Sequence, residues 1–91
     1  MSDNQPLFRV ETEKQVEKRL RKLQPKHRQQ VLKRIIDLQN NPRPQDSVKL
    51  KGRNDFRLDM GDYRVLYEID YEINVVRVWR LIDRKEGYKH L

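Results

Sequence analysis

Four polar side chains in the second half of the chain could carry out chemistry on a phosphate. Arg57 and Arg64 lie on either side of Gly61-Asp62, and Arg84 and Tyr88 follow the last apolar segment. Guanidinium groups bind a phosphodiester bidentately, and they stabilise the charge that develops when the ribose 2′-hydroxyl attacks it. These residue types therefore suit RNA cleavage without a metal ion.

The same residues also allow structural interpretations. Arg64 could form a salt bridge with Asp59 or Glu68 on the surface of a sheet, and Tyr88 could pack on that sheet. Both alternatives remain open at the level of sequence.

The residue sets of most other catalytic sites are missing from this sequence. It has no Cys, which excludes a disulfide scaffold, a thiol nucleophile and a Cys-ligated metal. Its histidines, His27 and His90, have no carboxylate three or four residues further on, and its glycines are isolated, so no Gly-rich phosphate loop is formed. We therefore expect neither a metal ion nor a cofactor.

Apolar residues at helical spacing predict two helices in the first half of the chain. Thr12 and Gln15 fit a capping box at the start of the first helix, which should end at Gln24. Pro25 suits the first turn of the second helix, and Asn40-Asn41-Pro42 should end it. The stripes to be buried are Val16, Leu20 and Leu23 in the first helix and Val31, Ile35 and Leu38 in the second.

Alternating apolar residues predict a short strand at 7–10 and further strands after Ser47. Gly61-Asp62 fits a type II′ hairpin turn, a second hairpin should turn at 72–74, and 75–82 reads as a central strand. The order β-α-α-β-β-β predicts an α+β fold in which a helical hairpin packs on one face of an antiparallel sheet. If the apolar residues face the helices, Arg57 and Arg64 project from the other, open face.

The chain is small and strongly basic. Its 91 residues predict a single domain spanning 1–91, and 21 Lys and Arg against 14 Asp and Glu give a net charge of +7. Apolar runs are too short to span a membrane, and 1–7 lacks the apolar stretch of a signal peptide, so we expect a cytoplasmic protein.

The basic excess is concentrated between Lys14 and Arg34, where Glu17 is the only acidic residue. We expect this segment to bind a polyanion such as RNA, the alternative being a solvated helix face. The candidate RNA- and ribosome-binding residues are Lys18, Arg21, Lys22, Arg28, Lys49 and Lys51.

Nearly the whole chain resembles the RelE/ParE toxin superfamily, and more closely its RelE branch. The resemblance is carried by the segments 48–52, 55–58, 61–69 and 78–88, which contain KLKG, GDYRVLYEI and the R-x-x-x-Y element of Arg84 and Tyr88. It implies a RelE-like microbial ribonuclease fold and a toxin of a type II toxin–antitoxin system. Such a toxin cleaves mRNA in the ribosomal A site and is held inactive by a cognate antitoxin.

The resemblance also implies roles for individual residues. By position, Arg57 contacts the phosphate, Arg64 stabilises the transition state, and Arg84 assists the leaving group or stabilises charge. Tyr88 deprotonates the 2′-hydroxyl and stacks on a base. Asp59 departs from the pattern, because RelE members often have Lys or Arg there, and an anion would weaken phosphate binding.

Two other functions remain open on the same scaffold. One is a ParE-like toxin that inhibits DNA gyrase through protein contacts, and the other is a non-catalytic nucleic-acid-binding module. The expected partners are a cognate antitoxin, the ribosome and mRNA, with DNA reached only indirectly through the toxin–antitoxin complex and no membrane involved.

Overall fold

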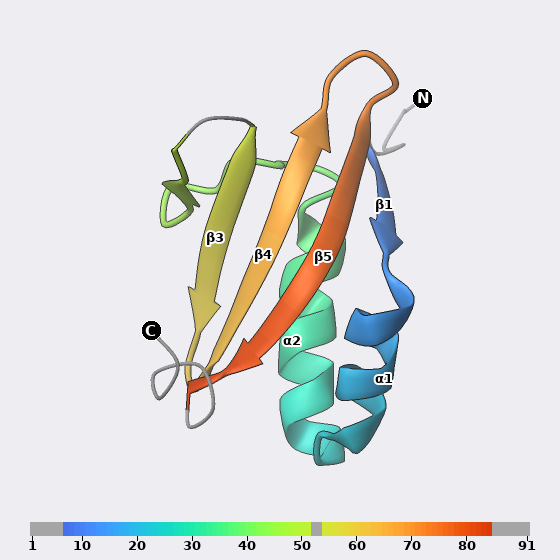
Figure 1. Ribbon diagram of the computed structural model, residues 1–91, viewed down its shortest axis with the longest axis vertical. Coiled ribbons are helices and arrows are strands. Elements are labelled where there is room, and N and C mark those ends of the chain that lie inside the picture. Colours follow the sequence, from blue (N-terminus) through green and yellow to red (C-terminus); the bar gives the residue numbers. More distant parts are fainter. Residues whose placement is uncertain (1–6, 52–53, 85–91) are drawn as a thin grey trace, which may run out of the picture.

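A five-stranded sheet carries two helices on one of its faces (Figure 1). The computed structural model describes residues 7–51 and 54–84. The elements are β1 (Arg9–Thr12), α1 (Lys14–Lys22), α2 (Pro25–Asp37), β2 (Val48–Lys49), β3 (Asp55–Met60), β4 (Tyr63–Asp70) and β5 (Val75–Asp83). This arrangement confirms the predicted α+β fold with a helical hairpin on one face.

The sheet is mixed rather than purely antiparallel. Its strand order is β1-β5-β4-β3-β2, and β1 pairs in parallel with β5, from Arg9 opposite Val75 to Thr12 opposite Val78. The other pairs are antiparallel, as expected for strands joined by hairpins. Residue alternation reports which face a side chain takes and carries no information on strand direction, so the β1–β5 pairing could not be read from it.

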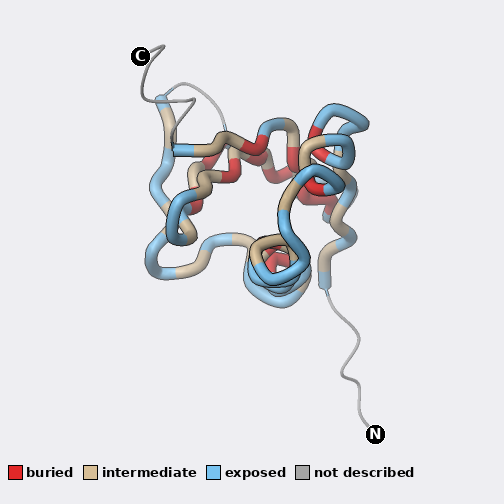
Figure 2. Tube along the Cα trace, turned by 90° about the horizontal axis from the view of Figure 1, so that it is seen from below, coloured by how far each residue is buried: buried red, intermediate tan, exposed pale blue. Residues whose placement is uncertain are grey.

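The hydrophobic core fills the space between the sheet and the helices, where the buried residues gather (Figure 2). Both predicted helix stripes point into it, although Leu23 is only partly buried. From the sheet, the core receives alternate residues of β3, β4 and β5, namely Phe56, Leu58, Val65, Tyr67, Ile69, Val76, Val78 and Leu81. Neither described helix is long and apolar enough to cross a membrane.

The first helix begins differently from the prediction. Its N-cap is Glu13, and no side chain makes a capping hydrogen bond there. The Thr12 hydroxyl donates to Glu17 Oε2 at 3.0 Å, and Gln15 Nε2 donates to the carbonyl oxygen of Trp79 at 2.7 Å. The predicted capping box is therefore wrong. Gln15 instead donates to a carbonyl oxygen of β5, an acceptor that local sequence cannot reveal.

A long-range cap closes the other end of α1. Arg28, in the first turn of α2, donates through Nε to Leu20 O at 3.0 Å and through Nη2 to Leu23 O at 2.8 Å and Arg21 O at 3.2 Å. The last carbonyls of a helix lack N–H partners four residues further on, and a cation there also favours the helix dipole. Leu20 O in addition accepts from the N–H of Leu23, the C-cap residue, at 3.1 Å. Arg28 thus joins the two helices, and α2 starts at Pro25 as predicted.

Replacing Arg28 by Ala should lower the free energy of unfolding by about 2 kcal/mol, because three carbonyls lose a charged donor. Arg21→Ala is the matched control, since the Arg21 side chain is exposed on α1 and its loss should cost less than about 0.5 kcal/mol. Urea denaturation followed by circular dichroism measures both. Equal unfolding midpoints for the two variants would contradict the capping role.

A buried tyrosine occupies the middle of the core. Tyr67 is fully buried, stacks on Phe56 with ring centroids 5.6 Å apart, and donates its hydroxyl to Pro42 O at 2.8 Å. Burial disfavours the phenolate and raises the pKa of Tyr67 to about 12.

Stability should therefore depend on pH at the alkaline end. Between pH 10 and 12 the unfolded chain loses the tyrosine proton while the folded chain keeps it, so stability is complete below about pH 10 and falls by about 2 kcal/mol as the pH approaches 12. Tyr67→Phe should lack this part of the decline, whereas Tyr71→Phe, at an exposed residue, should retain it. Urea denaturation at pH 9 to 12 makes the comparison, and parallel curves for all three proteins would refute it.

Candidate functional site

Arg57 and Arg64 meet on the open face of the sheet, next to the β3–β4 hairpin. Asp59 lies directly opposite Arg64 in the register, and Arg57 is two residues before Asp59 on the same face of β3. The turn between the strands contains Gly61 with φ +63°, while Asp62 does not have a positive φ. This combination agrees with the predicted type II′ turn and excludes type I′.

A single carboxylate oxygen holds both guanidinium groups. Arg64 Nε donates to Asp59 Oδ1 at 2.8 Å, and Arg57 Nε forms an ion pair with the same oxygen at 3.5 Å. The salt bridge between Arg64 and Asp59 foreseen as an alternative is therefore present. Because the Asp59 side chain is 51% exposed, an incoming anion can reach this group of three residues, which we call the arginine cluster.

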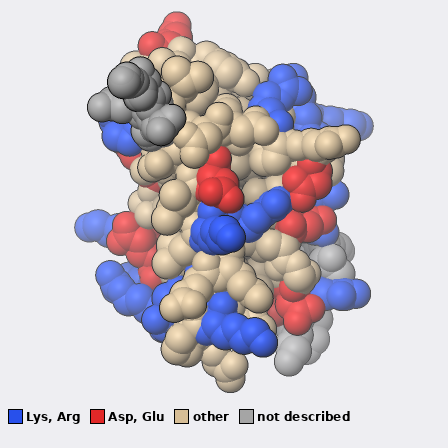
Figure 3. Space-filling view, turned by 180° about the vertical axis from the view of Figure 1, so that it is seen from behind, with Lys and Arg blue, Asp and Glu red and all other residues tan. Residues whose placement is uncertain are grey.

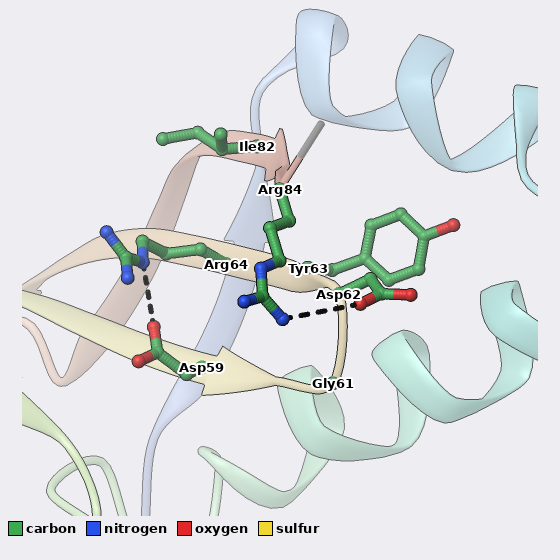
Figure 4. A pocket seen from close by; sticks show the side chains of 7 residues that line it. All are labelled: Asp59, Gly61, Asp62, Tyr63, Arg64, Ile82 and Arg84. Atoms are coloured by element: carbon green, nitrogen blue, oxygen red, sulfur yellow. Dashed lines mark hydrogen bonds and ion pairs between the residues drawn. The ribbon is translucent and has the colours of Figure 1, made fainter. Parts of the chain in front are cut away.

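Arg84, directly after β5, lies beside the arginine cluster. Its backbone N–H donates to Asp62 O at 2.7 Å, and its Nη1 lies 4.0 Å from Asp62 Oδ1. Arg64 and Arg84 line a small depression of about 60 Å³ together with Asp59, Gly61, Asp62, Tyr63 and Ile82 (Figure 4). The structure thus brings three of the four predicted catalytic residues to one end of the sheet, and Tyr88 lies outside the described residues.

Tyr63 was not singled out by the sequence, although it lines this depression. Its ring points away from Arg64 (Figure 4) and lies edge-on to His27 of α2, with centroids 5.6 Å apart. Burial, followed by the charges of Asp83 and Asp62, raises the pKa of Tyr63. The hydroxyl is therefore protonated at neutral pH and is unsuited to act as a base. Alternation along β4 groups it with Val65 and Tyr67, the residues expected to face the helices, and the structure agrees.

The predicted RNA-binding lysines and arginines do not form one surface with the arginine cluster. Lys18, Arg21 and Lys22 are exposed on α1, on the helix side of the sheet, and Arg28 is engaged in capping. Lys49 lies opposite Phe56, a core residue, so the register places Val48 rather than Lys49 beside Arg57. Lys51 is exposed just beyond β2.

The helix side of the molecule is also less uniformly basic than the segment 14–34 suggested. Red and blue side chains alternate over this face (Figure 3). Arg34, for example, forms a 2.6 Å ion pair with Asp46, which comes from the connection after α2. A carboxylate from a distant segment thus gives Arg34 an acidic partner that 14–34 lacks.

The open face carries acidic side chains beyond the arginine cluster. Asp55, Glu68, Arg77 and Glu11 occupy one row across β3, β4, β5 and β1. Arg77 pairs with Glu68 at 2.7 Å and with Glu11 at 3.7 Å, and the hydrogen bond to Glu68 raises the pKa of Arg77. Within 7–51 and 54–84, no group of three or more His, Cys, Asp or Glu could hold a metal ion.

Comparison with known proteins assigns the family. The model of the ParE toxin of the type II toxin–antitoxin system parDE matches residues 10–88, and no curated protein sequence matches the chain. The RelE–RelB complex of Pyrococcus horikoshii contains a similar chain, with a TM-score of 0.79 and 32% identity over 86% of this chain and 96% of that one. This chain belongs to the RelE/ParE superfamily and is a toxin of a type II toxin–antitoxin system.

Two further structures support the same fold. The complex RelBE2 of Mycobacterium tuberculosis contains a chain with a TM-score of 0.74 and 28% identity, over 87% of this chain and 99% of that one. The isolated RelE toxin of E. coli has a TM-score of 0.74 and 25% identity, over 91% of this chain and 93% of that one. The RelE-like fold expected from the sequence is thereby confirmed.

Asp59→Asn should increase the affinity for single-stranded RNA. The substitution removes the anion that competes with phosphate at Arg57 and Arg64, so we expect about fivefold tighter binding at low salt and a smaller gain in 0.5 M salt. Fluorescence anisotropy with a 2′-O-methylated oligoribonucleotide measures it. Asp37→Asn on α2 changes the net charge equally, and an identical gain for that variant would show that only total charge matters.

Proposed function

We propose that this toxin is a metal-independent endoribonuclease that cleaves mRNA on the ribosome. The observation that carries the proposal is the position of Asp59 Oδ1, an anionic oxygen approached by the Nε atoms of Arg57 and Arg64. A phosphate oxygen placed there would meet the same donors, and Arg84 stands at the same hairpin turn.

The proposed reaction uses the substrate's own nucleophile. The ribose 2′-oxygen attacks the adjacent phosphorus and the bond to the 5′-oxygen breaks, which leaves a 2′,3′-cyclic phosphate and a 5′-hydroxyl. Arg57 binds the phosphate, and Arg64 and Arg84 stabilise the negative charge that grows on it. Tyr88, which lies outside the described residues, is the proposed acceptor of the 2′-hydroxyl proton. The leaving 5′-oxygen takes up a proton from water, which Arg84 is proposed to position.

We propose that cleavage depends on the ribosome, because the described part of this site has few side chains that can donate or accept a proton at neutral pH. Arginine is a poor proton donor, and Tyr63 is on the other face with a raised pKa. Such a site gains rate when another body holds the substrate in the reactive geometry. The exposed Lys18, Arg21 and Lys22 on α1 are proposed to bind ribosomal RNA, with Lys49 and Lys51 at the β2 edge. The proposed location of the toxin is the cytoplasm, where it would meet ribosomes.

A cognate antitoxin is the proposed inhibitor of this activity. Two of the similar structures are complexes with RelB antitoxins. We propose that the antitoxin of this chain covers Arg57, Arg64 and Arg84 and thereby excludes RNA.

A ParE-like toxin directed at DNA gyrase is the second candidate. Two observations favour it: the matching family model is that of ParE, and Asp59 neutralises part of the cationic charge at the arginine cluster. This function would need no cleavage chemistry at Arg64 or Arg84.

Single-turnover cleavage of mRNA on programmed ribosomes tests the proposal. Arg64→Ala and Arg84→Ala should each reduce the rate by about 10²-fold or more with little loss of ribosome binding, because these groups act on the transition state. Arg9→Ala removes an equally charged, exposed side chain on β1 and should leave the rate unchanged.

The products and the metal requirement provide a second readout. They should carry 2′,3′-cyclic phosphate or 3′-phosphate ends, and EDTA should not abolish cleavage while the ribosomes stay intact. Wild-type rates for both arginine variants would overturn the nuclease proposal. Pulse labelling after induction then tests the second candidate, since a gyrase inhibitor stops DNA synthesis before protein synthesis.

A further inference from the structure

The single tryptophan of the chain lies on the open face, outside the arginine cluster. Trp79 is the extra residue of a β-bulge in β5, since Tyr67 pairs with Val78 and Leu66 pairs with Arg80. Val78 before the bulge and Leu81 after it are both buried in the core. Trp79 and Arg80 between them therefore both point away from the core, beside the start of α1.

The bulge is held in place from α1. Gln15 Nε2 donates to Trp79 O at 2.7 Å, which satisfies a carbonyl that the interrupted strand pairing leaves available. Trp79 is only partly buried, and among the described residues no other aromatic ring packs against it. A large aromatic side chain is thus held at a partly solvent-accessible position.

The two cavities that Trp79 lines differ in charge. The first, of about 300 Å³, is lined by Gln15, Arg19, Trp79, Arg80 and Leu81. The second, of about 260 Å³, is lined by Glu13, Asp55, Glu68 and Trp79. A ligand that is both aromatic and anionic would be attracted to the first cavity and repelled from the second.

The bulge is close to the arginine cluster. Arg57, Leu66 and Arg80 form one row across β3, β4 and β5 on the open face. Since neighbouring strands are about 4.8 Å apart, the backbone of Arg80 is about 10 Å from that of Arg57. A nucleotide next to a phosphate bound at Arg57 and Arg64 can reach this distance.

We propose that Trp79 is a stacking platform for an unpaired base of single-stranded RNA, with Arg80 and Arg19 binding the adjacent backbone phosphates. Aromatic side chains beside a cationic groove recognise unpaired bases in this way, with little dependence on sequence. The acidic cavity prevents the strand from continuing past Glu68, so the RNA runs from Trp79 toward Arg57. This proposal rests on the proposed function and adds a base-binding subsite to it.

The intrinsic fluorescence of Trp79 reports on this subsite directly. A 2′-O-methylated pentaribonucleotide, which lacks the attacking hydroxyl, should quench the emission of the native chain in a saturable manner. An abasic phosphodiester pentamer of equal charge should quench little and bind about tenfold more weakly.

Anisotropy with the labelled pentaribonucleotide extends the test to variants. Trp79→Leu should weaken binding about tenfold, Trp79→Phe should restore most of it, and Tyr71→Leu, at an exposed aromatic outside the subsite, should change nothing. Circular dichroism verifies that each variant is folded. If Trp79→Leu is unfolded, the comparison of base-containing and abasic probes on the native chain decides.

The proposal is overturned if the abasic probe binds and quenches as well as the RNA, or if folded Trp79→Leu binds like the wild type. Its failure is distinguishable from that of the proposed function. Cleavage by the native chain with no effect of Trp79→Leu on affinity refutes the platform alone. Base-dependent quenching without any cleavage on ribosomes refutes the nuclease alone.

Discussion

The register of the β3–β4 hairpin determines both the core and the arginine cluster. Val65 and Tyr67 enter the core from the same strand that carries Arg64 on the opposite face, and Leu58 and Asp59 divide in the same way on β3. A slip of one residue would move the arginine into the apolar layer and the tyrosine out of it. The positive φ of Gly61 permits the two-residue turn that sets this register. The cationic site is therefore maintained by the same packing that stabilises the fold.

The two helices cover one face of the sheet, and the charged side chains of the strands therefore gather on the other face. The helices bury the apolar residues of β3, β4 and β5, so polar side chains can occupy only the open face or the edges. There the charges are sorted along the strands, with Arg57, Arg64 and Arg84 at the β3–β4 hairpin and Asp55, Glu68 and Glu11 further away. A polyanion meets attraction at one end and repulsion at the other, which gives it a direction of binding.

Local sequence was sufficient for the features that depend on neighbours along the chain. The apolar stripes of both helices, the start of α2 at Pro25, the hairpin turn at Gly61 and the face of Arg57 and Arg64 were all predicted correctly. Features that arise from contacts between distant segments could not be predicted from local sequence. Arg28 looked like an RNA-binding residue and caps α1, and Asp46 supplies Arg34 with the acidic partner that its own segment lacks.

The bulge at Trp79 is the clearest case of such a distant effect. Simple alternation from Val76 would place residue 80 in the core, whereas the structure buries Leu81 and exposes Arg80. The parallel pairing of β1 with β5 brings Gln15, which follows β1 in the chain, within hydrogen-bond distance of the bulge carbonyl. At the bulge an indole and a guanidinium both point away from the core. Because Asp59 keeps Arg57 and Arg64 paired in the free protein, binding of a phosphate must displace a carboxylate, and contacts made elsewhere on this face can offset that cost. A base stacked on Trp79 would provide such a contact. The bulge would then offset the free energy that the phosphate loses by displacing Asp59 from Arg57 and Arg64.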